Sequence, residues 1–333
     1  MKVVIVGGVA GGATAAARIR RLDENAKITV FEKSGYVSYA NCGLPYYIGG
    51  AITDPEDLTL QTPESFKSRF QIDVRVRHEV TAVDTKEKTV KVKNLSTGEE
   101  FEESYDKLIL SPGAKPVKPS MTGVDTDRVF TLRTVEDTFR IHKFIAENDV
   151  KSAVIAGGGY IGLEMAENLT EKGIRVTIVQ RPNQVMAPLD YDMACQLHGL
   201  LRKKGITLKF GSSVTGFEEK DSLILTTLKD DEPLKSDLGI LAIGVTPDTA
   251  LAKDAGLALG IKGSIAVNER METSAADVYA VGDAVQVKNF VTGEDALISL
   301  AGPANKQGRI AADNICGLKS SYDGSQGSSV IKI

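Results

Sequence analysis

The feature that most constrains the fold is a strand-like apolar run that breaks into glycines and occurs twice, at residues 3–12 and again at 153–162. A helical stretch rich in Ala or Leu follows each copy, and a second apolar run follows each helix, at 27–31 and 175–179. A strand, a glycine turn, a helix and a second strand form a unit that builds parallel sheets. Two copies at this spacing are too few and too far apart for a solenoid. The sequence therefore predicts an α/β protein with two parallel-sheet domains.

The remaining strand-like segments predict how the two domains share the chain. Alternating residues at 74–101 predict a small antiparallel sheet, and 107–110 a buried strand. A further strand at 278–283 ends in a Gly-Asp turn, so the second domain is expected to be inserted into the first. The predicted order is a first domain at 1–115, a connecting segment at 116–149, the inserted domain at 150–266 and the rest of the first domain at 267–333.

Composition limits what such a protein does. The 333 residues include 40 Lys and Arg against 44 Asp and Glu, and a net charge of −4 argues against a nucleic-acid scaffold. No run approaches the ~20 apolar residues of a membrane span, and the first residues lack the cleavage site of a signal peptide. Three cysteines are too few for a disulfide framework, and three histidines argue against a metal cluster. We expect a cytoplasmic protein with no metal, nucleic-acid or membrane partner.

The second glycine run satisfies the G-x-G-x-x-G spacing with Gly157, Gly159 and Gly162. These glycines allow a tight turn, the close approach of a pyrophosphate and the packing of helix on strand, and the helix start beyond them offers N–H groups to an anion. Gln180 and Arg181 stand where an acidic residue would mark NAD, so NADPH is allowed. The alternative is that Arg181 is a solvated loop residue, and the choice between NADH and NADPH stays open.

The first glycine run keeps only Gly7 and Gly12 of that spacing, because Val9 holds the middle position. Further glycines flank Val9 and backbone N–H groups remain available, so the run is a variant of the same motif. Glu32, twenty residues past Gly12 at the end of a strand, supplies the carboxylate expected for a ribose diol. Either run alone is explained by an ordinary turn, but the pair with Glu32 predicts two Rossmann-like dinucleotide-binding domains of three layers each.

The most unusual segment is 38–50, which contains Cys42 ten residues past Glu32. A helix-like stretch follows, and a helix N-terminus stabilises a thiolate and so lowers the pKa of a thiol. No nearby cysteine forms a C-x-x-C pair, so Cys42 would act through a mixed disulfide, a persulfide or a sulfenic acid. A buried structural thiol is an equal alternative. Cys195 and Cys316 fall on amphipathic helical patterns and are expected to be buried and inert.

Together these motifs resemble those of the FAD-dependent pyridine nucleotide–disulfide oxidoreductases, over essentially the whole chain. The segment 38–46 is most similar to their single-cysteine branch, on the side of coenzyme A-disulfide reductases and NAD(P)H-dependent CoA-persulfide reductases. That branch also contains NADH oxidases and peroxidases. Residues 273–283 are similar to the family's second flavin motif, and 299–304 to its helix start beside the flavin. The resemblance implies an NAD(P)H oxidoreductase that acts on a sulfur group through FAD and Cys42.

The resemblance also implies where each ligand binds. For FAD it implies Gly7, Val9, Ala10, Gly11, Gly12, Glu32, Lys33, Val80, Ser111, Gly113, Asp283 and Ala301. For NADPH or NADH it implies Gly157, Gly159, Tyr160, Ile161, Gly162, Glu164, Gln180, Arg181 and Gly244, with Glu164 near the nicotinamide. For CoA, as substrate or bound thiol, it implies Thr14, Arg18, Arg21, Ser38 and Asn41.

The three CoA residues at 14, 18 and 21 share one helix face, where two guanidiniums and a hydroxyl can grip phosphates. The alternative is a solvated basic helix face. Relatives can have a basic CoA contact near position 70, where this chain has Phe70, although Arg69 adjoins it. The chain also ends where relatives continue into a C-terminal dimerisation domain, which we expect to be absent here. A full-length form is expected to be a homodimer, and a monomer is the alternative for this chain.

Two other functions compete with the reduction of CoA disulfide or CoA persulfide. One is an NADH oxidase or peroxidase in which Cys42 cycles through a sulfenic acid. The other is a flavin-bound redox sensor or electron-transfer protein in which Cys42 is structural. The sequence does not distinguish CoA disulfide from persulfide, polysulfide, peroxide or oxygen as the acceptor.

Overall fold

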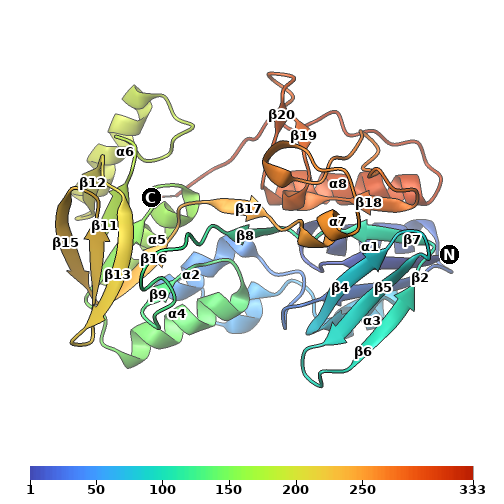
Figure 1. Ribbon diagram of the computed structural model, residues 1–333, viewed down its shortest axis with the longest axis horizontal. Helices are drawn as coiled ribbons and strands as arrows, with labels where there is room; N and C mark the ends of the chain where they lie inside the picture. Colours follow the sequence, from blue (N-terminus) through green and yellow to red (C-terminus); the bar gives the residue numbers. More distant parts are fainter. Residues whose placement is uncertain (333) are drawn as a thin grey trace. The chain divides into compact units, whose positions relative to one another are not determined.

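The computed structural model describes residues 1–332, which divide into two compact units (Figure 1). Unit 1 comprises Met1–Tyr39, Thr59–Lys115 and Thr246–Ser329, and unit 2 comprises Ala40–Leu58, Pro116–Val245 and 330–332. The chain passes from unit 1 to unit 2 within the short strand β8 (Ala114–Pro116) and returns within β17 (Val245–Pro247). These two strands pair with each other. Within the described residues, no helix has both the length and the apolar character needed to cross a membrane.

Unit 1 is built on a five-stranded parallel sheet in the order β18-β7-β1-β2-β3. Its strands are β1 (Lys2–Val6), β2 (Lys27–Glu32), β3 (Asp73–Val76), β7 (Lys107–Leu110) and β18 (Val278–Ala280). The central strand β1 is covered on both faces, and Val3 to Ile5 are completely buried. A strand in this position needs a continuous apolar run, which explains why the sequence reads Val-Val-Ile-Val there.

Helices and smaller sheets complete unit 1. The helices are α1 (Ala10–Leu22), α3 (Pro63–Phe70), α7 (Ala250–Asp254) and α8 (Ala301–Ile315), with single turns η3 (Ile261–Gly263) and η4 (Gly282–Ala284). An antiparallel sheet contains β4 (His78–Asp84), β5 (Thr89–Asn94) and β6 (Glu100–Ser104), and a short pair contains β19 (Val287–Lys288) and β20 (Asp295–Ala296). Helices α1 and α8 touch through their backbones, because a Cβ added at Gly308 would lie 2.4 Å from the Gly11 carbonyl oxygen.

Unit 2 repeats the design with a parallel sheet in the order β12-β11-β10-β16-β9. Its strands are β9 (Val129–Phe130), β10 (Ser152–Ala156), β11 (Arg175–Gln180), β12 (Thr207–Phe210) and β16 (Leu238–Leu241). The helices are α2 (Leu44–Gly49), α4 (Val135–Glu147), α5 (Tyr160–Glu171) and α6 (Tyr191–Lys203), with turns η1 (Asn41–Gly43) and η2 (Pro55–Leu58). An antiparallel sheet contains β13 (Val214–Lys220), β14 (Leu223–Leu228) and β15 (Asp231–Ser236). The predicted α/β class with two parallel sheets is confirmed.

The units differ from the predicted domain boundaries at four segments. One is 330–332, which falls in unit 2 instead of the first domain. Residues 40–58 belong to unit 2, because α2 packs on α5 so closely that a Cβ at Gly49 would lie 2.2 Å from Asn168 Oδ1. Residues 116–149 are no separate connecting segment, since they supply the edge strand β9 and helix α4 of unit 2. Residues 246–266 belong to unit 1, where Ile265 is completely buried in the core.

Candidate functional site

The first glycine turn joins β1 to α1 in unit 1, and only glycine fits two of its positions. Gly7 has φ +93°, and a Cβ there would lie 2.1 Å from the Ser111 carbonyl oxygen. A Cβ at Gly12 would lie 1.9 Å from the Gly7 carbonyl oxygen. Val9 precedes the helix as its N-cap and supplies no side-chain hydrogen bond to the first turn. The helix start therefore offers backbone N–H groups to an anion.

Glu32 is held beside this turn by the backbone. Glu32 is 8% exposed, and its Oε2 accepts a hydrogen bond from the Gly8 N–H at 2.8 Å. The other oxygen, Oε1, accepts one from the Ser34 N–H at 2.9 Å. A carboxylate has about four acceptor sites, so capacity remains for two hydroxyl groups. This arrangement fits the ribose diol of an adenine dinucleotide.

Two further loops of unit 1 follow β7, which pairs with β1 in the parallel sheet, and β18, which pairs with β7. Carboxyl ends of parallel strands share one edge, so 111–113 and 281–283 lie at the same edge as the glycine turn. The Gly282 N–H donates to Gln307 Oε1 at 2.7 Å, and Gln307 is 1% exposed. Sequence analysis missed Gln307, although a polar residue among the buried positions of α8 was the available signal. The glycine turn, Glu32 and this edge together fit the dinucleotide part of FAD.

Other residues predicted for FAD have mixed surroundings. Val80 lies in β4 and is buried, and Ala301 is the first residue of α8 and exposed. The Lys33 ammonium pairs with Asp248 at 3.1 Å on an exposed part of unit 1. A role of Val80, Ala301 and Lys33 in FAD binding therefore stays a prediction.

The second glycine turn joins β10 to α5 in unit 2. Gly157 has φ +108°, and a Cβ there would lie 2.3 Å from the Ala242 carbonyl oxygen. A Cβ at Gly162 would lie 2.0 Å from the Gly157 carbonyl oxygen, whereas one at Gly159 would meet nothing within 4 Å. The middle position therefore faces open space, as the approach of a pyrophosphate requires.

The acceptor beside the second turn is an amide instead of a carboxylate. The Gly158 N–H donates to Gln180 Oε1 at 2.9 Å, and Arg181 after it is exposed. Gly244 follows β16 at φ +117° with open space around its Cβ position. Tyr160 is 38% exposed at the first position of α5, and Ile161 beside it is half-buried. Gln180 brings no negative charge that would oppose a 2′-phosphate, so this residue does not exclude NADPH.

Cys42 lies in η1, directly before α2, and its side chain is exposed. Partial burial by its surroundings and the Glu164 carboxylate of α5 raise the pKa of the Cys42 thiol. The predicted lowering of this pKa is therefore wrong for the protein chain itself. Helix α2 has six residues, too short for a strong terminal field, and a carboxylate opposes the thiolate. Burial and the neighbouring Glu167 also raise the pKa of Glu164.

The residues predicted for CoA contact other elements within their own units. Thr14 Oγ1 donates to Asn305 Oδ1 at 2.8 Å, and Arg18 Nε pairs with Asp313 at 2.7 Å, so both face α8. The Arg21 guanidinium lies 5.9 Å from the centre of the Phe70 ring. Ser38 has φ +48° and donates its N–H to the Gly8 carbonyl oxygen at 2.9 Å in unit 1. Asn41 begins η1, next to Cys42 in unit 2.

The other two cysteines correct a second expectation. Cys195 is exposed, because the buried side of α6 consists of Ala194, His198 and Leu201. Cys316 is half-buried at the carboxyl end of α8. His198 packs against Phe210 with ring centres 4.7 Å apart and accepts the Val185 N–H at 3.2 Å, so its role is structural.

Comparison with known proteins defines the family. The sequence profile of the family described as pyridine nucleotide-disulphide oxidoreductase matches residues 1–308. The coenzyme A disulfide reductase of Staphylococcus haemolyticus is 38% identical over 99% of this chain and 74% of its own length. The reduced CoADR-RHD of Bacillus anthracis superposes with a TM-score of 0.97 at 50% identity, over 99% of this chain and 59% of that one. The NAD-dependent persulfide reductase from A. fulgidus gives 0.96 at 36% identity, over 100% of this chain and 62% of that one.

This chain belongs to the pyridine nucleotide-disulphide oxidoreductase family. This confirms three expectations from the sequence: the family, an oxidoreductase activity, and FAD and NAD(P) as cofactors. The chain spans about three fifths of the length of the two solved relatives and about three quarters of the curated one. Its substrate and the residues that act on it are taken up next as proposals.

Proposed function

We propose that the protein reduces a small-molecule disulfide or persulfide of coenzyme A with NAD(P)H, using FAD and the single redox-active thiol of Cys42. The observation on which this rests is the position of Cys42 in unit 2. The exposed thiol lies before α2, which packs on α5, and α5 begins at the second glycine turn. A thiol directly before one helix, and a nucleotide-binding turn at the start of the helix on which that helix packs, suit an NAD(P)H-linked sulfur reductase.

The two units divide the cofactors in this proposal. Unit 1 binds FAD through the first glycine turn, Glu32 and the loops after β7 and β18. Unit 2 binds NAD(P)H through the second glycine turn and Gln180. Bound FAD supplies the means of passing the two electrons of a hydride to sulfur.

Cys42 performs the covalent step as a nucleophile. Its thiolate attacks one sulfur of CoA disulfide, the sulfur–sulfur bond breaks, and one CoA thiolate leaves while the other CoA remains joined to Sγ. Two electrons from NAD(P)H then release the second CoA and restore the thiolate. Overall, one CoA disulfide, one NAD(P)H and one proton give two CoA thiols and NAD(P)⁺. With CoA persulfide, the outer sulfur leaves as hydrogen sulfide.

Burial and, to a smaller extent, the charge of Glu164 make the thiolate of Cys42 harder to form. The negative charge of Glu164 opposes the thiolate and raises the pKa of Cys42, and the pKa of Glu164 is itself raised by burial and by Glu167. When Glu164 takes up a proton, its charge no longer opposes the thiolate, and the effect of burial remains. We propose that Glu164 is a positioning residue that couples the protonation of this region of unit 2 to the reactivity of Cys42.

Anaerobic oxidation of NAD(P)H by the FAD-loaded protein tests the proposal. CoA disulfide and CoA persulfide are compared with hydrogen peroxide and, in a separate aerobic arm, oxygen. The expected result is rapid oxidation with one of the CoA substrates and release of CoA thiol or hydrogen sulfide in the ratios given above. Faster turnover of peroxide or oxygen than of either CoA substrate would replace the proposal with an oxidase or peroxidase.

A further inference from the structure

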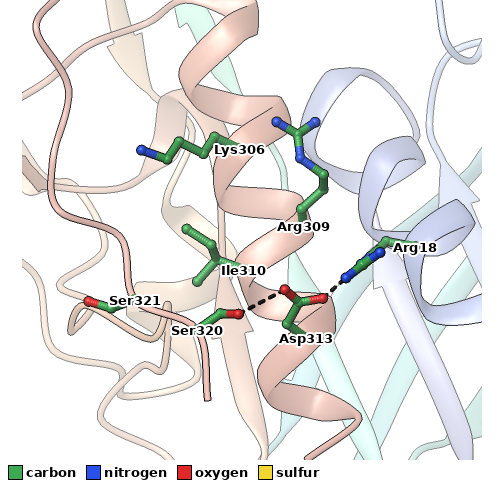
Figure 2. Close-up of a pocket in the computed structure, with 7 residues that line it drawn as sticks. All are labelled: Arg18, Lys306, Arg309, Ile310, Asp313, Ser320 and Ser321. Atoms are coloured by element: carbon green, nitrogen blue, oxygen red, sulfur yellow. Dashed lines mark hydrogen bonds and ion pairs between the residues drawn. The ribbon is translucent and has the colours of Figure 1, made fainter. Parts of the chain in front are cut away.

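Glu167 of unit 2 is a buried carboxylate without hydrogen bonds. It lies in α5, its side chain is 0% exposed, and within residues 1–332 neither of its oxygens accepts a hydrogen bond. Asp313 of unit 1 differs, because it accepts from Arg18 at 2.7 Å and from Ser320 at 2.8 Å, as the dashed lines in Figure 2 show. Burying a carboxylate without donors is costly, so the charge of Glu167 must be balanced in another way.

Two lysines partly balance the charge of Glu167. The Lys332 ammonium, in the segment 330–332 of unit 2, lies 3.5 Å from Oε1. The Lys204 ammonium, directly after α6, lies 3.9 Å from the same oxygen. Lys332 is 66% exposed and also pairs with Glu171 at 4.0 Å, so water and a second carboxylate weaken its effect on Glu167. The charge of Glu167 is therefore balanced only in part.

Glu164 lies one turn before Glu167 on the same face of α5. Burial and the Glu167 charge raise the pKa of Glu164. Burial also raises the pKa of the Cys42 thiol, and the Glu164 charge raises it further. A change at Glu167 therefore reaches Cys42 through Glu164, and all three residues belong to unit 2.

Tyr46 of α2 senses the same charges. Burial and the charges of Glu167 and Glu164 raise the pKa of Tyr46. The Lys332 charge lowers it, and the Lys332 ammonium lies 5.9 Å from the centre of the Tyr46 ring. Glu167 and Lys332 thus act with opposite sign on the side of α2 that follows Cys42.

Further charged groups lie on or beside α5. Lys172, after the end of α5, acts on α4, where burial and the Lys172 charge lower the pKa of His142. In the strands β10 and β11, on which α5 packs, the charged residue is Arg175, which is exposed. Glu167 is the charged residue whose effect on the pKa of Glu164 stands beside that of burial.

We propose that Glu167 is a positioning residue of the Cys42 site that acts through Glu164, and that Lys332 is the counter-ion that limits its action. The buried charge of Glu167 makes a second charge on Glu164 unfavourable, so Glu164 takes up a proton at a higher pH than an isolated carboxyl. A neutral Glu164 does not oppose the thiolate that attacks the substrate. The part of this inference that concerns the substrate rests on the proposed function.

The test follows the rate at which iodoacetamide, an uncharged reagent, alkylates Cys42 from acid to alkaline pH. All proteins are FAD-loaded and contain C195S and C316S, so that Cys42 is the thiol that reacts. The rate follows the amount of thiolate, and the loss of a proton from Glu164 makes the thiolate harder to form. The profile therefore has an inflection where Glu164 ionises. Loss of this inflection in E164Q assigns it.

We expect opposite shifts when the two charges are removed. E167Q removes the charge that opposes ionisation of Glu164 and should move the inflection to lower pH. K332Q removes a counter-ion and should move it to higher pH, but less so in the E167Q background. The matched controls, K143Q and E147Q, break an exposed ion pair of 3.8 Å on α4 and should leave the inflection in place.

Several results would overturn the inference. An inflection that stays in place or moves to higher pH in E167Q overturns the role of Glu167, and one that stays or moves to lower pH in K332Q overturns that of Lys332. If E167Q does not fold, K332Q decides, because Lys332 is exposed. The absence of an inflection in the parent, or its persistence in E164Q, overturns the coupling to Glu164.

Turnover of CoA disulfide separates this inference from the proposed function, because alkylation of Cys42 needs no CoA substrate. If the inflection moves as expected but the protein reduces no CoA substrate, the proposed function fails, while the control of the Cys42 thiol by these charges stands. If CoA disulfide is reduced but the inflection moves in neither E167Q nor K332Q, this inference alone fails.

Discussion

The two glycine turns have the same backbone geometry in different units. The first glycine has φ +93° at Gly7 and +108° at Gly157. Inside each helix, a Cβ added to the glycine would lie too close to the carbonyl oxygen of that first glycine, at 1.9 Å for Gly12 and 2.0 Å for Gly162. The geometry is fixed by the need to turn from a buried strand directly into a helix.

The similarity extends past the second strand of each unit. Ser38, at φ +48°, donates its N–H to the Gly8 carbonyl oxygen at 2.9 Å, and Met186, at φ +50°, donates to that of Gly158 at 2.8 Å. The turns differ in the acceptor for the glycine N–H, which is the carboxylate of Glu32 in unit 1 and the amide of Gln180 in unit 2. The shared backbone therefore fits a dinucleotide in each unit, and the two turns differ in whether a negative charge lies beside the ribose position.

The largest effect is expected from a substitution that distorts the backbone geometry shared by the two turns. Gly157→Ala places a Cβ against a backbone carbonyl at a positive φ, so we expect the free energy of unfolding to fall by about 3 kcal/mol or more. The matched control is Gly159→Ala, two residues away, where φ is −87° and a Cβ would meet open space. It should lower the free energy of unfolding by at most about 1 kcal/mol. Denaturant unfolding measures both, and equal losses would contradict this account of the turn.

A charge change in unit 2 sharpens the comparison. Gln180→Glu keeps an acceptor for the Gly158 N–H but adds the negative charge that unit 1 has at the same place. Repulsion of a 2′-phosphate should lower the ratio of NADPH to NADH affinity by about tenfold, or about 1.4 kcal/mol. Titration of both coenzymes measures it. An unchanged ratio would mean that Gln180 does not face the adenosine ribose.

The reciprocal change in unit 1 is expected to be somewhat smaller. Glu32→Gln keeps an acceptor for the Gly8 N–H and removes the charge-assisted hydrogen bond to a ribose hydroxyl. FAD should bind about fivefold to tenfold more weakly, a loss of about 1 kcal/mol. Equilibrium dialysis of flavin from parent and variant gives the ratio, and tighter binding by the variant would contradict the assigned contact.

The smallest effect concerns the pH at which Cys42 reacts. The Glu164 charge raises the pKa of Cys42, so Glu164→Gln should lower that pKa and move the pH profile of alkylation by iodoacetamide toward lower pH. Glu171→Gln, on the same helix and exposed, is the control and should leave the profile in place. A Glu164→Gln profile at the same or higher pH would contradict the coupling.

Features that depend on a local pattern were predictable from sequence. The two βαβ units, both glycine turns and the position of Glu32 follow from spacing along the chain. Features that depend on packing were not. The sequence does not show that α5 brings Glu164 toward Cys42, that Cys195 falls outside the buried face of α6, or that Gln307 reaches the Gly282 N–H.

Reduction of CoA disulfide by Cys42→Ser protein tests the central claim most directly. The variant should retain FAD and still bleach the flavin absorbance with NAD(P)H, because neither depends on sulfur at position 42. It should lose NAD(P)H-dependent reduction of CoA disulfide, since a serine hydroxyl forms no mixed disulfide. Cys195→Ser, which removes another exposed thiol, should leave the rate unchanged. A Cys42→Ser protein that reduces CoA disulfide as fast as the parent would contradict the account.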